Sequence, residues 1–308
     1  MKKIFYSNGK LLLTGEYAVL DGARALALPT RFGQYLEVEP YKNNLLHWTS
    51  KDADGSVWLD ETIRIDGSGK WLPTNETPEA TRLIQILEAA HKSNPDILAT
   101  GGYKVTTRLT FPRGWGLGSS STLINNIAKW FGADPYALLA ESFGGSGYDI
   151  ACAKHNTPII YRNDHGTPQV EPATFNPAFT DKLYFVYLNR KQDSREGITA
   201  YRTRENDTDA IIPHIDELTQ EVLKATSLSD FCMALEIHEK LMSEILGMPT
   251  VKEILFPDFP GTLKSLGAWG GDFILAASGE NPEAYFRSRN FETVIPYREM
   301  ILEGDPTP

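Results

Sequence analysis

The chain has 308 residues and a mass of 34.3 kDa, and its 30 basic and 40 acidic residues give a formal net charge of −10. With 41% hydrophobic and 23% charged residues, the composition is globular, which excludes disordered, collagen-like and coiled-coil chains. The acidic balance and the lack of a basic run argue against a nucleic-acid or membrane-surface partner. They leave a phosphate ligand open, because backbone N–H groups at a helix start bind phosphate on acidic proteins too.

Two features of the sequence bear on where the protein works. Cys152 and Cys232 are too few for a disulfide framework and stand in apolar runs, so we expect both to be small core residues. The start of the chain is too polar for a signal peptide, and no stretch approaches the ~18 apolar residues of a membrane helix. The expected location is therefore the cytoplasm.

The chain up to residue 112 favours strands. Apolar or alternating runs bounded by turn residues predict strands at residues 11–20, 25–28, 34–39, 45–48, 57–65 and 103–111. The pair Asp54-Gly55 between two of these runs is a hairpin signal. A single helix interrupts the strands, with Thr77 as its N-cap and Pro78 at its first position.

Helices dominate from residue 114 on. One helix is expected after the glycine-rich stretch 114–118 and ends at Gly132, and another follows it. Further patterns predict strands at 157–162, 182–188 and 273–277 and helices at 215–225 and 230–246. The polar, proline-bearing stretch 163–181 separates two halves. We therefore predict an α+β fold with two domains, residues 1–165 and 166–308.

The sharpest chemical signal is the loop at residues 111–122. Glycine stands at every second position from Gly114 to Gly118, between an expected strand and an expected helix, so the backbone can turn tightly there. The serines that follow would cap the helix, whose first N–H groups and dipole favour an anion. The chain has no GxxxxGK[ST] motif, and the loop lacks the third glycine of a dinucleotide fingerprint. The loop alone leaves two interpretations open: a phosphate site, or an ordinary glycine turn before a capped helix.

Together with three other segments, this loop resembles the motifs of the GHMP small-molecule kinases, such as galactokinase, homoserine kinase, mevalonate kinase and phosphomevalonate kinase. Residues 111–121 resemble the family's P-x-x-x-G-L-G-S-S-[AS] phosphate loop. Residues 9–22 resemble the N-terminal segment of its mevalonate-pathway branch. Residues 146–151 resemble the S-G-x-D-x-A segment with the catalytic aspartate, and residues 267–273 the C-terminal G-A-G-G-G-D motif. The motifs follow the family's order over nearly the whole chain, which is specific to the superfamily and much less so to a substrate.

The resemblance implies a two-lobed α+β fold with a ferredoxin-like C-terminal half, and ATP and Mg²⁺ as cofactors. It implies an enzyme that transfers the γ-phosphoryl group of ATP to a small metabolite, most of all to 5-phosphomevalonate or mevalonate. Because charge develops on the transferred phosphoryl oxygens, such catalysis depends on positioning and on fixed positive charge. The expected partner is this small molecule, and the expected assembly is a monomer or a homodimer.

The resemblance also implies roles for single residues. The ATP phosphates are assigned to Gly116, Leu117, Gly118, Ser119, Ser120 and Ser121. Asp149 would be the base or orienter for the acceptor oxygen, and Lys10 beside it would favour the carboxylate form and lower the pKa of the acceptor hydroxyl. The Ser120 hydroxyl would face Mg²⁺, and Glu141 is the nearest candidate for a second magnesium carboxylate. Substrate contacts are assigned to Glu16, Lys191, Ser194, Arg195, Gly270 and Gly271.

Each of these residues also has a structural interpretation. Asp149 fits a helix N-cap after a glycine turn, and Lys10 fits a solvated lysine at a strand edge. Glu141 fits a surface position on a helix, and Glu16 fits a structurally paired carboxylate. Residues 191–195 fit a solvated charged turn. The six histidines show no metal-binding spacing and are assigned to structure or surface.

Two positions depart from the family's pattern. Asn8 replaces the proline usual before Gly9, and Trp269 replaces a glycine inside the third motif, where an indole would either stack on a ligand or narrow the cleft. They motivate an alternative function, a catalytically silent protein of the same fold that binds a nucleotide or a metabolite. A sugar kinase is a further variant, but the galactokinase-type His-x-Asp-Tyr signature is absent after Glu16.

Overall fold

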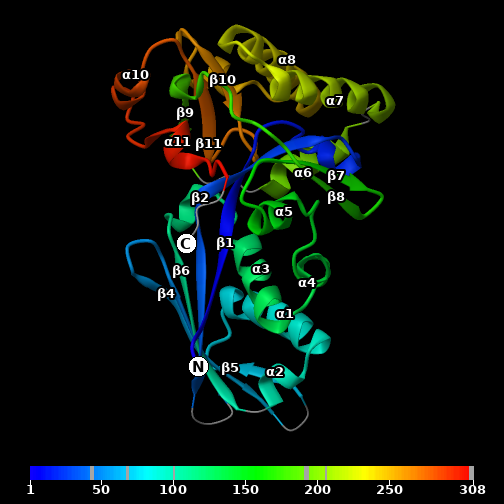
Figure 1. Cartoon of the computed structure of the whole chain (residues 1–308), viewed down its shortest axis with the longest axis vertical. Coiled ribbons are helices and arrows are strands. Elements are labelled where there is room, and N and C mark those ends of the chain that lie inside the picture. The colour runs from blue at the N-terminus through cyan, green and yellow to red at the C-terminus, as the bar shows by residue number, and fades with distance from the viewer. Residues whose placement is uncertain (42–44, 67–68, 100, 191–193, 205–206, 305–308) are drawn as a thin grey trace. The chain divides into compact units, whose positions relative to one another are not determined.

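The computed structural model describes residues 1–41, 45–66, 69–99, 101–190, 194–204 and 207–304, and in residues 194–196 only the backbone. The chain forms two compact units, whose helices and strands Figure 1 labels. Unit 1 comprises Met1–Gly9, Phe32–Arg113 and Leu117–Lys154. Unit 2 comprises Lys10–Arg31, Gly114–Gly116 and the chain from His155 onward. The boundary expected at residue 165 falls inside unit 2, which also contains part of the expected first domain.

The helices and strands divide between the units as follows. Unit 1 contains β3 (Leu45–Lys51), β4 (Val57–Ile65), β5 (Trp71–Pro73), α1 (Pro78–Ser93), α2 (Asp96–Ala99), β6 (Gly102–Leu109), α3 (Ser119–Phe131), α4 (Pro135–Ser142) and α5 (Tyr148–Lys154). Unit 2 contains η1 (Ala18–Asp21), β7 (Ile159–Asp164), β8 (Thr167–Pro172), η3 (Thr180–Lys182), β9 (Leu183–Tyr187), α6 (Ser194–Thr203), α7 (Thr208–Lys224), α8 (Leu228–Leu246), α9 (Val251–Leu255), β10 (Thr262–Ser265), β11 (Phe273–Ala277), α10 (Glu283–Arg287), β12 (Val294–Pro296) and α11 (Tyr297–Met300). Two strands, β1 (Lys3–Leu12) and β2 (Ala25–Tyr41), and the 3-10 turn η2 (Arg113–Trp115) contain residues of both units.

Unit 1 is a sheet covered by helices on one face. Its strands follow the order β5-β4-β3-β6-β2, with β3 and β6 parallel and the other neighbours antiparallel. Alternate residues of β3 are buried, as expected for a strand with one face in the core. Two of these residues, Leu46 and Trp48, pack with apolar side chains of α1, α3 and α4, which lie together beside the sheet in Figure 1. This packing holds the N-terminus of α3 at the end of the glycine-rich loop.

The C-terminal part of unit 2 is ferredoxin-like. Its four strands form an antiparallel sheet in the order β10-β11-β9-β12. The chain passes from β9 through helices to β10 and β11, and through α10 to β12, which is the β-α-β-β-α-β pattern of that fold. The predicted α+β class with a ferredoxin-like C-terminal half is therefore confirmed.

Both faces of this C-terminal sheet are buried, which explains its continuous apolar strands. β11 is buried at every position, and Ile274 and Ala276 pack with Phe256 and Phe286 on one face. On the other face Phe185 stacks near Tyr297, with ring centroids 6.0 Å apart. Elsewhere in unit 2, β7 pairs with the first residues of β2 and with β8, and α7 packs against α8, beside which it lies in Figure 1.

Strong local signals gave the most accurate predictions. β4 has the predicted bounds, and the Thr77 hydroxyl accepts the Ala80 N–H at 3.1 Å at the start of α1. The strand predicted at 11–20 is wrong beyond Leu12, because the chain turns at Gly15 (φ +81°) into a 3-10 turn. The stretch 163–181 is not only a connection, since it contains β8, which the sequence hides because none of its residues is buried.

Among the described residues, none of the helices combines the length and the apolar character that a membrane crossing requires.

Candidate active site

The glycine-rich loop ends in unit 1 at the N-terminus of α3. Gly118 is the N-cap of this helix, with φ +88° and no side-chain cap hydrogen bond. The expected serine cap is therefore wrong, because the left-handed backbone at this position favours glycine, which has no Cβ. Since no side chain caps them, the first N–H groups of α3 can donate to an anion, which the helix dipole also favours.

The three serines after Gly118 have different surroundings. Ser119 is half-buried and Ser120 is exposed, both in the first turn of α3. Ser121 is buried, and its hydroxyl donates to the Gly118 carbonyl at 2.8 Å. The Thr122 hydroxyl lies 2.8 Å from Gln34 Oε1 on β2. Ser121 and Thr122 therefore hold the helix start, while the side chains of Ser119 and Ser120 are accessible.

Asp149 lies in the first turn of α5, also in unit 1. Its side chain is half-buried, and its Oδ1 accepts the N–H of Ile150 at 3.0 Å. α5 is tied to α3 because Asn125 Nδ2 donates to the Ala153 carbonyl at 3.1 Å and to the Ser7 hydroxyl at 2.8 Å. Buried hydrogen bonds of Asn125 thus connect α5, which carries Asp149, to α3 within unit 1.

Three sequence motifs meet in unit 2 around Gly116. Lys10 Nζ, at the end of β1, donates to the Gly116 carbonyl at 2.9 Å. Gly116 has φ +67°, and a Cβ at this position would overlap the carboxylate of Asp272. A Cβ on Gly267 would lie 3.9 Å from Lys10 Nζ. The N-terminal motif, the glycine-rich loop and the C-terminal motif therefore place a lysine and a carboxylate against one glycine.

Aromatic side chains fix the first half of the glycine-rich loop. The Tyr187 hydroxyl donates to the Gly114 carbonyl at 3.1 Å. The Trp115 ring packs edge-on against Phe273, with centroids 5.4 Å apart. Burial raises the pKa of Tyr187, and the charge of Asp272 raises it further, so the phenol remains a donor at neutral pH. The loop backbone is therefore held where Lys10 and Asp272 reach it.

Glu16 is a paired, buried carboxylate. It is 1% exposed and forms an ion pair with Lys264, which also pairs with Glu239 at 3.1 Å. Sequence reasoning missed Lys264 and Glu239. Lys264 lies in the strand Thr262–Ser265, where Leu263 is the single apolar residue, so its own segment gave no signal of burial.

Trp269 is a core residue of unit 2. It is 3% exposed, and its Nε1 donates to the Pro249 carbonyl at 3.1 Å. Its backbone N–H donates to the Tyr17 hydroxyl at 2.8 Å, and both side chains belong to an apolar cluster with Met242. Packing with these partners therefore fixes the indole within the apolar cluster. Asn8, the other departure from the pattern, is buried in β1.

The remaining predicted residues are more widely spread. Glu141 is exposed on α4 and pairs with Lys92 at 3.4 Å, which favours its surface interpretation. Gly270 has φ +76° with open space around it. Gly271 donates its N–H to the Ala268 carbonyl at 3.3 Å. Ser194 and Arg195 open α6, where only the backbone is described, and Lys191 lies outside the described residues.

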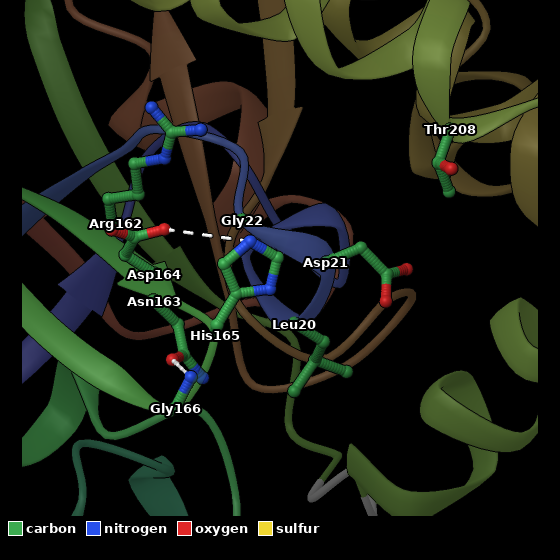
Figure 2. A pocket seen from close by; sticks show the side chains of 9 residues that line it. All are labelled: Leu20, Asp21, Gly22, Arg162, Asn163, Asp164, His165, Gly166 and Thr208. Atoms are coloured by element: carbon green, nitrogen blue, oxygen red, sulfur yellow. Dashed lines mark hydrogen bonds and ion pairs between the residues drawn. The ribbon is translucent and has the colours of Figure 1, made fainter.

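A polar pocket of about 390 Å³ lies elsewhere in unit 2 (Figure 2). Its lining residues are Leu20, Asp21, Gly22, Arg162, Asn163, Asp164, His165, Gly166 and Thr208. Its acidic side chains already have partners, since Asp21 pairs with Arg202 at 2.7 Å and Asp164 with His165 at 3.9 Å. The pocket lacks every residue assigned to ATP or catalysis, so we place the candidate active site at the motifs.

The described part of the chain contains no group of three His, Cys, Asp or Glu side chains arranged to hold a metal ion. Mg²⁺ in nucleotide sites keeps several waters and takes substrate phosphates as ligands, so it needs few protein groups. An exposed serine hydroxyl beside unpaired helix N–H groups, as at Ser120, fits that requirement.

The chain matches no family model and no curated protein. Solved structures match over nearly its whole length. The mevalonate kinase of Methanococcus jannaschii is 18% identical, with a TM-score of 0.67, and the match covers 96% of each chain. The phosphomevalonate kinase of Streptococcus pneumoniae, solved with phosphomevalonate and AMPPNP, is 15% identical, with a TM-score of 0.67 and coverage of 94% of this chain and 96% of that chain.

A D-glycero-D-manno-heptose 1-phosphate kinase from Bacteroides thetaiotaomicron is 15% identical, with a TM-score of 0.68 and coverage of 99% of this chain and 97% of that chain. All three are members of the GHMP kinase superfamily. At these identities the matches show a shared fold. The resemblance to the GHMP kinases is thereby confirmed for the fold of both units.

Proposed function

We propose that the protein is an ATP-dependent kinase that transfers the γ-phosphoryl group to a small metabolite. The observation that carries this proposal is the meeting of three motifs at Gly116, where Lys10 binds its carbonyl and the Asp272 carboxylate lies against its Cα. The loop continues from there into an α3 N-terminus without a side-chain cap, which suits a phosphate. The shared fold with solved kinases supports the same reaction class.

In this proposal the nucleotide phosphates bind at the end of the loop. The N–H groups of Leu117 to Ser121 donate to phosphate oxygens, and the Ser120 hydroxyl faces Mg²⁺. Bound there, Mg²⁺ would neutralise charge on the phosphate oxygens. Ser121 contributes through its backbone, because its hydroxyl is engaged with Gly118.

Asp149 and Lys10 serve the acceptor in this proposal. Asp149 takes or orients the proton of the acceptor oxygen, and Lys10 contributes fixed positive charge. The single variants Asp149→Ala and Lys10→Met test the two roles separately, and each should lower kcat.

For the acceptor we propose 5-phosphomevalonate, with mevalonate second. The N-terminal segment and the aspartate of the C-terminal motif, Asp272, resemble the mevalonate-pathway branch, and the solved mevalonate and phosphomevalonate kinases share the fold. Galactose and heptose 1-phosphate kinases share it as well, so the fold itself does not distinguish the acceptors.

The test is ADP release from Mg-ATP against a panel of mevalonate, 5-phosphomevalonate, galactose, homoserine and no acceptor. We expect acceptor-dependent ADP with 5-phosphomevalonate and about 10³-fold slower release with Asp149→Ala. Turnover with another member of the panel corrects the acceptor and keeps the kinase. If nothing in the panel turns over but Mg-ATP raises the melting temperature, either the acceptor lies outside the panel or the protein is the silent binder of the alternative. No rise in melting temperature contradicts the phosphate loop itself.

A further inference from the structure

One group of buried charges in unit 2 is not used by the proposed reaction. The Lys264 side chain, on β10, is fully buried and pairs with Glu16 and with Glu239 of α8. His238 of α8 is also fully buried, with its Nε2 3.6 Å from Glu16 Oε2. We call Lys264, Glu16, Glu239 and His238 the Lys264 cluster. Stability alone does not explain such a group, because a buried ion pair is on average no more stabilising than apolar side chains of the same volume.

On one side, the cluster holds Ser265, which precedes the third glycine motif by two residues. Lys264 Nζ donates to the Ser265 carbonyl at 2.7 Å. The Ser265 N–H donates to both oxygens of Glu239 at 3.1 Å, and the Ser265 hydroxyl donates to Glu239 Oε1 at 2.6 Å. Every polar group of Ser265 is thus bound to the cluster, two residues before Gly267.

On the other side, the cluster holds the turn of the first motif. Glu16 binds Lys264, and the N–H of Gly15 donates to His238 Nε2 at 3.0 Å. A Cβ on Gly15 (φ +81°) would overlap the backbone of residues 24 and 25, so the turn is tightly packed as well. The Thr14 hydroxyl accepts from the Leu26 N–H at 3.1 Å, which fixes the chain just before the turn.

Both held segments lead directly to the centre around Gly116. The first continues backward along the chain into β1, where Lys10 binds the Gly116 carbonyl. The second continues forward through Gly267 to Asp272, whose carboxylate lies against Gly116. We propose that Lys264 is a positioning residue: by binding Glu16, Glu239 and the Ser265 carbonyl together, it sets the geometry between Lys10 and Asp272. Its catalytic meaning rests on the proposed kinase function.

The charge states of Lys264 and His238 allow the contacts of the Lys264 cluster to form. Burial opposes the Lys264 charge, but the Glu16 and Glu239 carboxylates outweigh it and raise the pKa of Lys264, so it stays an ammonium. Burial lowers the pKa of His238 well below its usual range, with Lys264 and His214 of α7 adding to the effect, so the imidazole stays neutral and can accept from Gly15. Lys264 therefore keeps its contacts with Glu239 and the Ser265 carbonyl at neutral pH, where Glu16, whose pKa burial raises to about 7, titrates.

The test compares Lys264→Met with Lys252→Met. Lys252 is a matched control, because its Nζ also donates to a backbone carbonyl, that of Gly261 at 2.7 Å beside β10, but it lies outside the cluster. With substrates near saturation and both variants folded, we expect Lys264→Met to lower kcat about 30-fold with KM for ATP changed less than about threefold, since small misplacements act on the reacting geometry. Lys252→Met should stay within about twofold of the native kcat. A lower melting temperature with a native kcat would overturn the positioning role.

Two further measurements keep the inference testable. If Lys264→Met does not fold, Glu239→Gln removes one charge at similar volume and weakens the hold on Ser265, and a kcat about tenfold lower is expected; a native kcat overturns the inference. Amide hydrogen exchange needs no turnover and so separates this inference from the kinase proposal. We expect Lys264→Met to speed amide exchange more in residues 10–17 and 265–273 than elsewhere in unit 2. A uniform change in exchange would contradict the proposal that Lys264 holds these two segments.

Discussion

At the N-terminus of α3, backbone N–H groups end at a glycine cap without a side-chain partner, whereas the Lys264 cluster surrounds its ammonium with two carboxylates and a carbonyl. The first region is accessible at Ser120, and the second is almost fully buried. Both are polar, and both lie beside a glycine motif.

The difference indicates two uses of polar groups. N–H groups that bind a ligand have no protein partner and lie at the surface, where they donate hydrogen bonds to water until an anion replaces the water. Groups that fix backbone geometry are buried and paired, because an unpaired charge inside the protein would be strongly destabilising. If this comparison holds, substitutions in the accessible region change activity more than stability, and substitutions in the cluster change both.

The largest effect is expected for Asp149→Ala on α5, whose half-buried side chain is proposed, like Ser120, to serve a ligand. The acceptor oxygen loses its base or orienter, so kcat should fall about 10³-fold. The affinity for ATP and the melting temperature should change little, because the phosphate loop does not depend on this carboxylate. The comparison fails for this residue if kcat stays near native, or if the variant loses stability and nucleotide binding together.

The next effect concerns the stability of the cluster as a function of pH. Burial raises the pKa of Glu16 to about 7, although Lys264 lowers it, and Glu239 adds repulsion. The folded protein then keeps a proton that the unfolded chain releases above the ordinary value of 4.5. Rising pH between about 5 and 7 therefore favours the unfolded chain, and the contribution, on the order of 3 kcal/mol, is present below 4.5 and lost by about pH 7.

Comparison with Glu16→Gln isolates this contribution. Glutamine has the shape of the protonated acid and does not titrate. The melting temperature of the Glu16→Gln variant therefore lacks the part of the decline with rising pH that Glu16 causes. The native melting temperature minus that of the variant should decrease from pH 5 to 7 and then level off. His238 has the opposite sign, because its neutral folded form is disfavoured at low pH, and the subtraction removes most of that effect. A difference that is constant with pH would mean that Glu16 is already ionised at pH 5.

The extent to which the sequence predicted the fold depended on local signals. The N-cap of α1 and the alternation of β4 are encoded within a few residues, and the structure has both elements with their predicted starts. β8 forms a hairpin with the preceding strand β7, but none of its residues is buried, so no apolar pattern marks it. The 3-10 turn at Ala18–Asp21 lies in an apolar run, which the apolar pattern alone does not distinguish from a strand.

The same distinction applies to the candidate site. Lys10, Gly116 and Asp149 stand in motifs, so a single sequence was enough to single them out. Lys264 pairs with a carboxylate 248 positions away, and nothing in its own segment indicates a buried partner. The Trp269 indole was unassignable for the same reason, because its orientation depends on packing with Tyr17 and Met242.

A smaller effect is expected when a Cβ is added to the glycine between Lys10 and Asp272. Gly116→Ala must displace the Asp272 carboxylate, so kcat/KM should fall about tenfold. Gly132→Ala is the matched control, because Gly132 has φ +66°, close to the +67° of Gly116, but nothing within 4 Å of an added Cβ. Both variants carry the same backbone penalty of about 1–2 kcal/mol. Equal loss of activity in the two would mean that the approach of Asp272 to Gly116 has no catalytic role.

The smallest effects separate two adjacent serines of α3. Ser121→Ala removes the hydrogen bond to Gly118, so the free energy of unfolding should fall by about 1 kcal/mol while the Mg²⁺ concentration for half-maximal activity stays unchanged. Ser120→Ala should keep stability within about 0.5 kcal/mol and raise that Mg²⁺ concentration, because its exposed hydroxyl is the proposed ligand. Urea unfolding and Mg²⁺ titration of the activity measure the two quantities. If each substitution changed both the free energy of unfolding and the Mg²⁺ concentration, Ser121 and Ser120 would not have separate structural and ligand-binding roles. The N-terminus of α3 and the Lys264 cluster would then differ only in how deeply their polar groups are buried.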